Sequence, residues 1–212
     1  PCTAKKFEAS REEFVRNGVP DVDYVLTSEE VIGMFKEIGI RFDRLEPEAY
    51  DMPFSIYSGA GVIFGATGGV TEAAVRRVVA DKSPKALKEI EFIGVRGMEG
   101  VKECELNLEE RTIRIGIVSG LGNADRLLQK IECGEEYFDF VEVMACPGGC
   151  VAGAGQPFAR STEKRMRAEG LYKNDKALQI KRSEENPLVD TLYQDLLKNR
   201  EHELLHVSYM HE

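Results

Sequence analysis

The sequence of 212 residues has no tryptophan, only three histidines, and ten asparagines and glutamines together. It also lacks an excess of basic side chains, because 28 Lys and Arg stand against 37 Asp and Glu and give a net charge of −9. An acidic chain disfavours nucleic acid or an acidic membrane surface as its partner. The scarcity of Asn and Gln beside abundant Glu, Lys and Arg indicates a heat-adapted source, that is, a thermophile.

No run approaches the ~18–20 apolar residues that a membrane span requires. The chain also shows no leader of charged, apolar and small residues, and it begins at Pro1 instead of methionine. We therefore expect a cytoplasmic protein that has lost its initiator methionine, or the downstream part of a longer chain. Its length suits one large domain, or one domain with an appendage, and its 42% apolar residues argue against disorder.

Strand and helix patterns alternate along the chain, which is typical of an α/β fold. Thr27 and Glu30 form a capping box that predicts a helix ending at Gly39. Further helices are expected over 71–79 and 124–131, where apolar residues recur at helical spacing. Short apolar runs predict strands over 21–26, 90–95, 102–108, 112–118 and 138–143.

These elements predict two regions. Residues 1–158 are expected to form one lobe with a largely parallel sheet flanked by helices. Residues 159–212 read as a helical, charged tail that wraps around the lobe. Within this tail, Asn186 and Pro187 are a good cap and first-turn pair for a helix.

The five cysteines are an odd number, which indicates reduced thiols and not a disulfide framework. Cys146 and Cys150 lie in a glycine-rich loop at the exit of a predicted strand. Thiolates are the soft ligands that iron–sulfur clusters and zinc prefer, and small residues between the two cysteines leave room for a bulky guest. The alternative is that one or both are ordinary buried thiols in a turn.

Cys2 is a third candidate ligand because Lys5 and Lys6 follow closely, and a neighbouring cation lowers the pKa of a thiol. A terminal cysteine near lysines can also be incidental. Cys104 and Cys133 have no partner signature, so we expect both to be structural.

Two other motifs invite a functional interpretation. The glycine-rich stretch 59–69 suggests a phosphate-binding loop, but it lacks the Gly-Lys-Ser/Thr ending, and close backbone packing against a cofactor or another lobe is favoured. His202-Glu-Leu-Leu-His206 matches the His-Glu-x-x-His pattern of zinc proteases. This motif ends six residues before the last residue given, which leaves little chain for a third ligand, so histidines that dock the tail are favoured instead.

Three long segments, 1–8, 57–70 and 142–157, together resemble the catalytic domain of iron-only (FeFe) hydrogenases. The resemblance extends over the whole chain, including a C-terminal part similar to the family's small subunit. It implies a 4Fe-4S cluster joined through one cysteine sulfur to a two-iron subcluster that carries CO, CN⁻ and a dithiolate bridge. The activity it implies is the reversible interconversion of H₂ with protons and electrons.

The resemblance also implies roles for individual residues. Cys2 and Cys146 are similar to cluster ligands, and Cys150 to the ligand that bridges to the two-iron unit. Lys5 resembles the lysine that hydrogen-bonds a cyanide, which makes Lys5 and Cys150 the catalytic candidates. The residues expected to contact the cofactor are Lys5, Phe64, Gly65, Met144 and Gln156.

The sequence departs from the family's pattern at two places. The segment from Gly153 to Pro157 carries Ala154 where the family has glycine, and one extra methyl group is expected to have a mild effect. The Thr-Ser-Cys-Cys-Pro-x-Trp motif, which supplies the fourth cluster ligand and a proton-relaying thiol, is missing. We therefore expect an upstream N-terminal lobe as partner, without which the chain is inactive, and an electron carrier such as ferredoxin or a nicotinamide-linked subunit.

A non-catalytic relative remains the alternative. Proteins of the iron–sulfur assembly type keep the 4Fe-4S cysteines and lack the two-iron centre, and the segment from Cys146 to Cys150 is compatible with them. Lys5 favours the hydrogenase, because a cyanide-binding lysine has no purpose without cyanide. A free-standing module that binds a smaller cluster or a single metal through Cys2, Cys146 and Cys150 is a third possibility.

Overall fold

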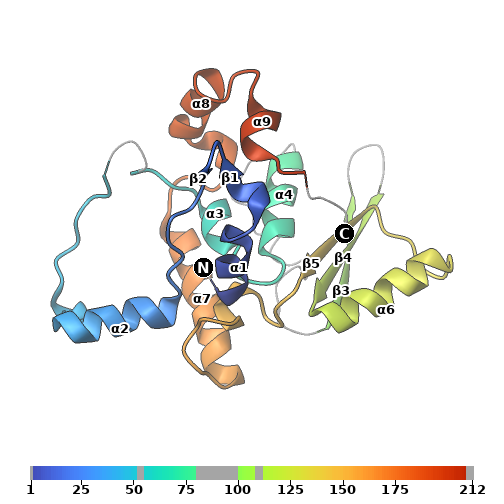
Figure 1. Ribbon diagram of the computed structural model, residues 1–212. Helices are drawn as coiled ribbons and strands as arrows, with labels where there is room; N and C mark the ends of the chain where they lie inside the picture. Colours follow the sequence, from blue (N-terminus) through green and yellow to red (C-terminus); the bar gives the residue numbers. More distant parts are fainter. Residues whose placement is uncertain (1, 52–54, 80–99, 108–111, 209–212) are drawn as a thin grey trace. The chain divides into compact units, whose positions relative to one another are not determined.

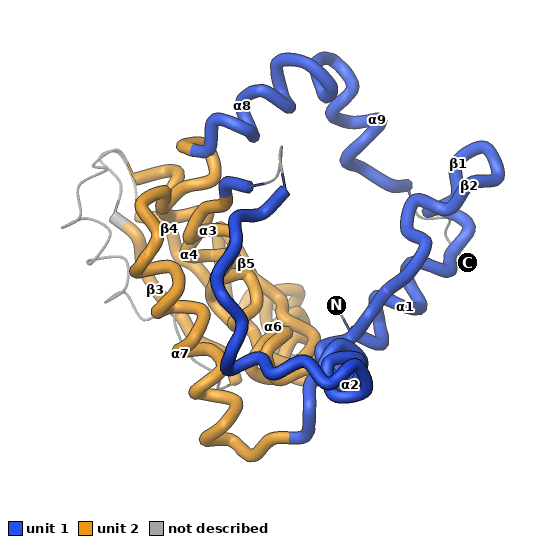
Figure 2. Tube along the Cα trace, turned by 90° about the vertical axis from the view of Figure 1, so that its left-hand side faces the viewer, with its two compact units in different colours: residues 1–56, 154–158, 186–212 blue, residues 57–153, 159–185 orange. Residues whose placement is uncertain are grey.

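The computed structural model describes residues 2–51, 55–79, 100–107 and 112–208 (Figure 1). The chain divides into two compact units, each assembled from segments that are far apart in sequence (Figure 2). Unit 1 comprises residues 1–56, 154–158 and 186–212, and unit 2 comprises residues 57–153 and 159–185. Over the described ranges, no helix combines the length and the apolar character that crossing a membrane requires.

Unit 2 is built around a sheet with the strand order β3-β4-β5. The strands β3 (Val101–Asn107) and β4 (Thr112–Ser119) are antiparallel, whereas β5 (Phe140–Met144) runs parallel to β4. The α/β class is therefore confirmed, but the described sheet is mixed and not largely parallel. The reason is the short connection after β3, since a few residues can join only antiparallel neighbours. The strand predicted over 90–95 lies outside the described residues.

Helices cover both faces of this sheet. Alternate residues of β4 point to opposite sides. Ile115 and Ile117 pack with Val75 of α4 (Gly69–Val78), whereas Val118 packs with Leu127 of α6 (Leu121–Glu132). Unit 2 is thus a layered helix–sheet–helix core.

Two further helices extend unit 2. α3 (Gly59–Ile63) precedes α4 and packs against α7 (Ser161–Ala177), the first helix of the predicted helical tail. Among its described residues, unit 2 also contains the short helical turns η3 (Cys150–Ala152) and η4 (Ser183–Glu185). The sequence did not predict α3, because five glycines within twelve residues disfavour a helix in isolation.

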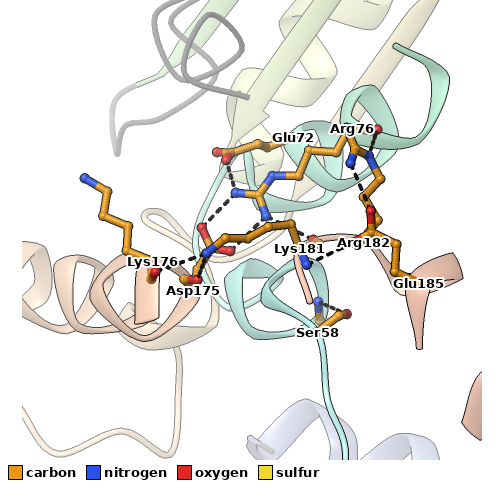
Figure 3. A network of polar contacts seen from close by, with 9 residues as sticks. Ser58, Glu72, Arg76, Asp175, Lys176, Lys181, Arg182 and Glu185 are labelled. Atoms are coloured by element: carbon orange, nitrogen blue, oxygen red, sulfur yellow. Dashed lines mark hydrogen bonds and ion pairs between the residues drawn. The ribbon is translucent and has the colours of Figure 1, made fainter. Parts of the chain in front are cut away.

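A buried charge network joins α4 to α7 (Figure 3). The Arg76 guanidinium of α4 donates to Glu72 Oε1 at 2.5 Å and to Asp175 Oδ1 and Oδ2 at 2.9 and 2.8 Å. All three side chains are at most 3% exposed. Arg182 Nε donates to the Arg76 carbonyl at 2.6 Å. Burial opposes the charge of Arg76, but Asp175 and Glu72 outweigh it and raise its pKa.

Unit 1 begins with α1 (Thr3–Ala9) and the turn η1 (Glu12–Phe14). A small hairpin follows, in which β1 (Val15–Arg16) pairs with β2 (Val19–Pro20). Asn17 and Gly18 form its turn with φ of +54° and +78°, as a tight hairpin requires. The strand predicted over 21–26 is wrong, because that segment contains bends and pairs with no described strand.

The predicted helix caps of unit 1 are confirmed. α2 (Ser28–Ile38) begins with the capping box of Thr27 and Glu30 and ends at Gly39, whose φ is +77°. The Asn186 side chain accepts the Leu188 N–H at 3.0 Å at the start of α8 (Pro187–Gln194). The remaining elements of unit 1 are η2 (Phe42–Arg44) and α9 (Glu201–Leu205).

The capping box makes the start of α2 sensitive to acid. The Thr27 N–H, Lys6 and the Thr27 hydroxyl lower the pKa of Glu30 from 4.5 to about 2. Because the folded-state pKa is depressed, this stabilisation is fully present above pH 4.5 and is lost as the pH falls towards 2. We expect an NMR titration to place the Glu30 midpoint near pH 2. A midpoint near 4.5 would contradict the capping box, and Glu30→Gln should keep the cap but remove its pH dependence.

Candidate cluster-binding site

The Cys146–Cys150 loop leaves the sheet at the ends of β4 and β5. These strands are parallel, so their carboxyl ends lie at the same edge, and the Gly120 N–H donates to the Met144 carbonyl there at 2.8 Å. Within the loop, the Gly149 N–H donates to the Cys146 carbonyl at 2.9 Å. Cys146 is half-buried and Cys150 is exposed. Two thiols are thus presented within one turn at the edge of the sheet.

Glycine is required at one position beside these thiols, and a second glycine leaves little room for a side chain. Gly149 has φ +84° and ψ −171°, a conformation reserved for glycine, and a Cβ there would lie 2.7 Å from the Gly65 carbonyl oxygen. A Cβ on Gly153 would lie 3.1 Å from Cys146 Sγ. The backbone of the earlier glycine-rich stretch therefore packs directly against the cysteine loop of the same unit, whereas the sequence predicted packing against a cofactor or another lobe.

Cys2 lies in unit 1, at the N-cap position of α1. The Thr3 N–H donates to the Ala154 carbonyl at 3.4 Å, and a Cβ on Gly155 would lie 3.3 Å from the Cys2 Cα. Ala154 itself is exposed, and the mild effect of its methyl group stays a prediction. In unit 1, Cys2 therefore lies beside the segment that directly follows Gly153 in the chain.

Other predicted site residues have protein contacts of their own. The Lys5 ammonium pairs with Glu8, and the Gln156 amide donates to Ser28 Oγ at 2.9 Å. Gly65 is half-buried, and its carbonyl accepts the Val151 N–H at 3.1 Å. Phe64 is 47% exposed and Met144 is half-buried. Among the residues that the structure describes, no three His, Cys, Asp or Glu side chains are arranged to hold a single metal ion.

The remaining cysteines and the His-Glu-x-x-His motif lie outside this region. Cys104 is buried in the core beneath α4, and burial raises the pKa of its thiol, so the structural interpretation is confirmed for it. Cys133 is the exposed C-cap of α6. His202 and His206 stack with ring centroids 4.8 Å apart, but both are exposed, and Glu203 pairs with Arg200 at 2.9 Å. Neither a zinc site nor histidines buried in a docked tail are observed in the described residues.

The polar side chains that hold the loop were not among the predicted site residues. Glu142 of β5 is 5% exposed and accepts the N–H groups of Gly68 and Thr71 at 2.8 and 2.7 Å. Ser119 at the end of β4 is 2% exposed and accepts the Gly148 N–H at 2.9 Å. A signal for Glu142 was available, because a charged residue within the apolar run Phe140–Met144 requires a buried partner.

Comparison with known proteins identifies the family. The model of the iron only hydrogenase large subunit, C-terminal domain, matches residues 1–154, and that of the iron hydrogenase small subunit matches residues 161–212. The NADP-reducing hydrogenase subunit HndD of Solidesulfovibrio fructosivorans is 42% identical over 99% of this chain. Cytosolic iron-sulfur assembly component 3 of Mus musculus is 32% identical over 99% of it.

The matched relatives are longer than this chain. The chain spans 37% of the length of the bacterial relative and 46% of that of the mouse relative. A solved structure of FeFe-hydrogenase HydA1 from Chlamydomonas reinhardtii superposes with a TM-score of 0.74 at 33% identity, covering 99% of this chain and 61% of the other. The chain therefore belongs to the iron-only hydrogenase family, and it corresponds to the C-terminal domain of the large subunit followed by small-subunit sequence.

Proposed function

We propose that this chain is part of an iron-only hydrogenase that interconverts H₂ with protons and electrons. Cys2, Cys146 and Cys150 are the proposed ligands of a 4Fe-4S cluster, with Cys150 also bridging to a two-iron subcluster that carries CO, CN⁻ and dithiolate ligands. When bound, the two-iron centre supplies the hydrogen chemistry and the 4Fe-4S cluster conducts the electrons. The observation that carries this proposal is the Cys146–Cys150 loop, which presents two thiols at the edge of the sheet.

The donor set has the chemistry that such a cofactor requires. The three proposed ligands are soft thiols, and iron–sulfur clusters select thiolates over harder oxygen ligands. Gly153 keeps side-chain bulk away from the Cys146 thiol, and Gly149 lets the loop pack closely against the backbone of residues 65–67. A 4Fe-4S cluster takes four cysteines. Cys104 is buried in the core and Cys133 ends α6, so we propose that the fourth thiolate comes from the upstream lobe.

The side chains around the thiols have separate proposed roles. Lys5 would exchange its contact with Glu8 for a cyanide nitrogen, an acceptor that is costly to bury without a donor. Phe64 and Met144 would form an apolar wall that excludes water from the cofactor. Gly65 would let the backbone approach the cofactor closely, and Gln156 would contact it. Each of these side chains positions or shields the metal centre, whose reactivity comes from its own ligands.

The missing ligand implies an upstream lobe, and unit 1 offers a surface that fits one. An apolar groove of about 620 Å³ lies along α2, lined mainly by Leu26, Val31, Ile32, Phe35, Ile40 and Phe42. No side chain of α2 is buried, although the helix is amphipathic. Leu26, Ile32 and Phe42 are exposed there, and neighbouring exposed apolar side chains that line a groove mark a candidate interaction surface. We propose that an upstream lobe of the longer protein covers it.

The electron partner follows from the same relatives. One of them is named as an NADP-reducing hydrogenase subunit, so we propose a nicotinamide-linked subunit or ferredoxin as the electron carrier. The acidic chain, with its net charge of −9, favours a basic docking surface on that carrier. A cytoplasmic location and a thermophilic source stay predictions from the sequence.

A non-catalytic role is the second candidate. The 32% identity to a cytosolic iron-sulfur assembly component over nearly the whole chain favours it specifically. In that role the same cysteines would hold a 4Fe-4S cluster without a two-iron centre, and Lys5 would keep its pairing with Glu8.

Infrared spectroscopy separates the two candidates. The sample is the full-length protein, with this chain joined to its upstream lobe and purified with its cofactors. We expect bands of iron-bound CO and CN⁻ and hydrogen evolution from a reduced dye. Cys150→Ser should abolish both, whereas Cys133→Ser, an exposed thiol on α6, should leave them unchanged. A protein that contains iron and sulfide but shows no such bands would contradict the hydrogenase proposal and support the assembly role.

A further inference from the structure

The Cys146–Cys150 loop is held by protein contacts that involve no metal. Its central N–H groups, those of Gly148 and Gly149, are directed to Ser119 Oγ and to the Cys146 carbonyl. The Val151 N–H, just after the loop, donates to the Gly65 carbonyl at 3.1 Å. Since the backbone donors on both sides of Cys150 already have acceptors, the loop has a defined shape in the metal-free chain.

Ser119 is the only side chain among these acceptors. It ends β4 opposite Met144 of β5, at the edge from which the loop leaves the sheet. Its hydroxyl is buried, accepts the Gly148 N–H at 2.9 Å and lies 3.5 Å from Thr67 Oγ1. Gly148 is itself buried, so its N–H has no access to water if the serine oxygen is removed.

Glu142 gives this arrangement a rigid base. Its carboxylate accepts the Gly68 N–H, the Thr71 N–H and the Thr71 hydroxyl at 2.8, 2.7 and 2.7 Å. Gly68 is the N-cap residue of α4 and has no side chain, so Glu142 caps this helix from the neighbouring strand. The strand that leads into Cys146 is thereby tied to the turn against which the loop packs.

We propose that Ser119 is a positioning residue that shapes the Cys146–Cys150 loop before any metal binds, so that both thiols are presented in advance. That these thiols then bind a cluster rests on the proposed function. The order of the loop itself is a property of the chain without metal. The physical reason is entropic. A loop that is already ordered does not lose conformational freedom when its ligands bind, and binding is stronger for that reason.

The test is the reactivity of Cys146 in the metal-free chain under reducing conditions. Iodoacetamide alkylation, resolved by mass spectrometry, follows each thiol, with the exposed Cys133 as internal reference. In Ser119→Ala the Gly148 N–H loses its acceptor, and one hydrogen bond corresponds to about a tenfold change in an equilibrium. We therefore expect Cys146 alkylation and Gly148 amide exchange to accelerate about tenfold, with an unchanged rate at Cys133.

Two variants separate loop order from general damage. Thr67→Val removes a buried hydroxyl beside Ser119 but leaves the Gly148 hydrogen bond, so it should behave like the wild type. Ser119→Thr keeps the hydroxyl and should restore slow alkylation. Wild-type rates in Ser119→Ala, or equal acceleration in Thr67→Val, would overturn the proposal. A failure of the full-length protein to bind iron would instead count against the proposed function, because the alkylation rates require no metal.

Discussion

Replacing Arg76 with methionine is expected to destabilise the chain by about 3–5 kcal/mol. The substitution keeps the length and apolar stem of the side chain but removes the guanidinium that the buried Glu72 and Asp175 carboxylates share. Breaking a buried ion pair from one side costs far more than the pair contributes, because the remaining charge is neither solvated nor neutralised. Urea unfolding, followed by circular dichroism, measures the change.

Arg77 provides the matched control for this substitution. It is the next residue of α4, it is 68% exposed, and it lies 3.7 Å from Glu184. Arg77→Met is expected to change stability by less than about 1 kcal/mol, as for other exposed ion pairs. If both substitutions have the same small effect, the network of Arg76 is not buried in solution. Replacing Glu72 and Asp175 with Gln and Asn in Arg76→Met should recover part of the loss, because no uncompensated charge then remains.

The second large effect is expected at Gly149. Gly149→Ala should cost on the order of 4 kcal/mol, because backbone strain and a steric clash add together. Its φ of +84° with ψ near 180° is essentially closed to other residues, and the new Cβ would lie 2.7 and 2.8 Å from Gly65 O and Thr67 N. These are backbone atoms, so no side chain can rotate out of the way. Urea unfolding measures the loss, and Cys146 alkylation reports whether the loop opens.

Substitutions at two other glycines separate the cost of the steric clash at Gly149 from the cost of backbone strain. Gly134 has φ +74°, and a Cβ added there would meet nothing within 4 Å, so Gly134→Ala should cost only about 1–2 kcal/mol. Gly122 lies inside α6 in open space, and Gly122→Ala should stabilise the helix by about 0.5–1 kcal/mol. If Gly149→Ala costs no more than Gly134→Ala, the loop does not pack against Gly65 in solution.

Local sequence signals predicted elements whose stability depends on near neighbours. The capping box of Thr27 and Glu30, the stop at Gly39 and the Asn186 cap all act within a few residues, and all three are confirmed. The Asn-Gly turn at Asn17 is an equally local signal, although the hairpin it forms was not predicted. The expected strand over 21–26 failed because a strand needs a partner, and no described segment pairs with it.

Some residues of the candidate site were predicted from the sequence, and others were found only in the structure. Cys146 and Cys150 became candidate ligands from the residues alone, because thiols near glycines in one loop already indicate a type of ligand, and Cys2 was assigned its role by the resemblance. All three ligand roles stay a proposal. Ser119 and Glu142 were not predicted, since each acquires its role from a residue 29 or more positions away. A serine at a strand end has no distinguishing feature until the neighbouring strand brings Gly148 to it.

The amino-acid sequence was therefore sufficient for the family and the capped helices, which depend on residue type and short spacing, whereas the ligand roles of the cysteines stay a proposal. The three-dimensional arrangement was needed to find the mixed sheet and the side chains that hold the cysteine loop. It was also needed to find the ion pair between Arg76 and Asp175, which lie 99 positions apart. The physical reason is that burial and hydrogen-bond partners arise from contacts between distant segments, and these contacts exist only once the chain has folded.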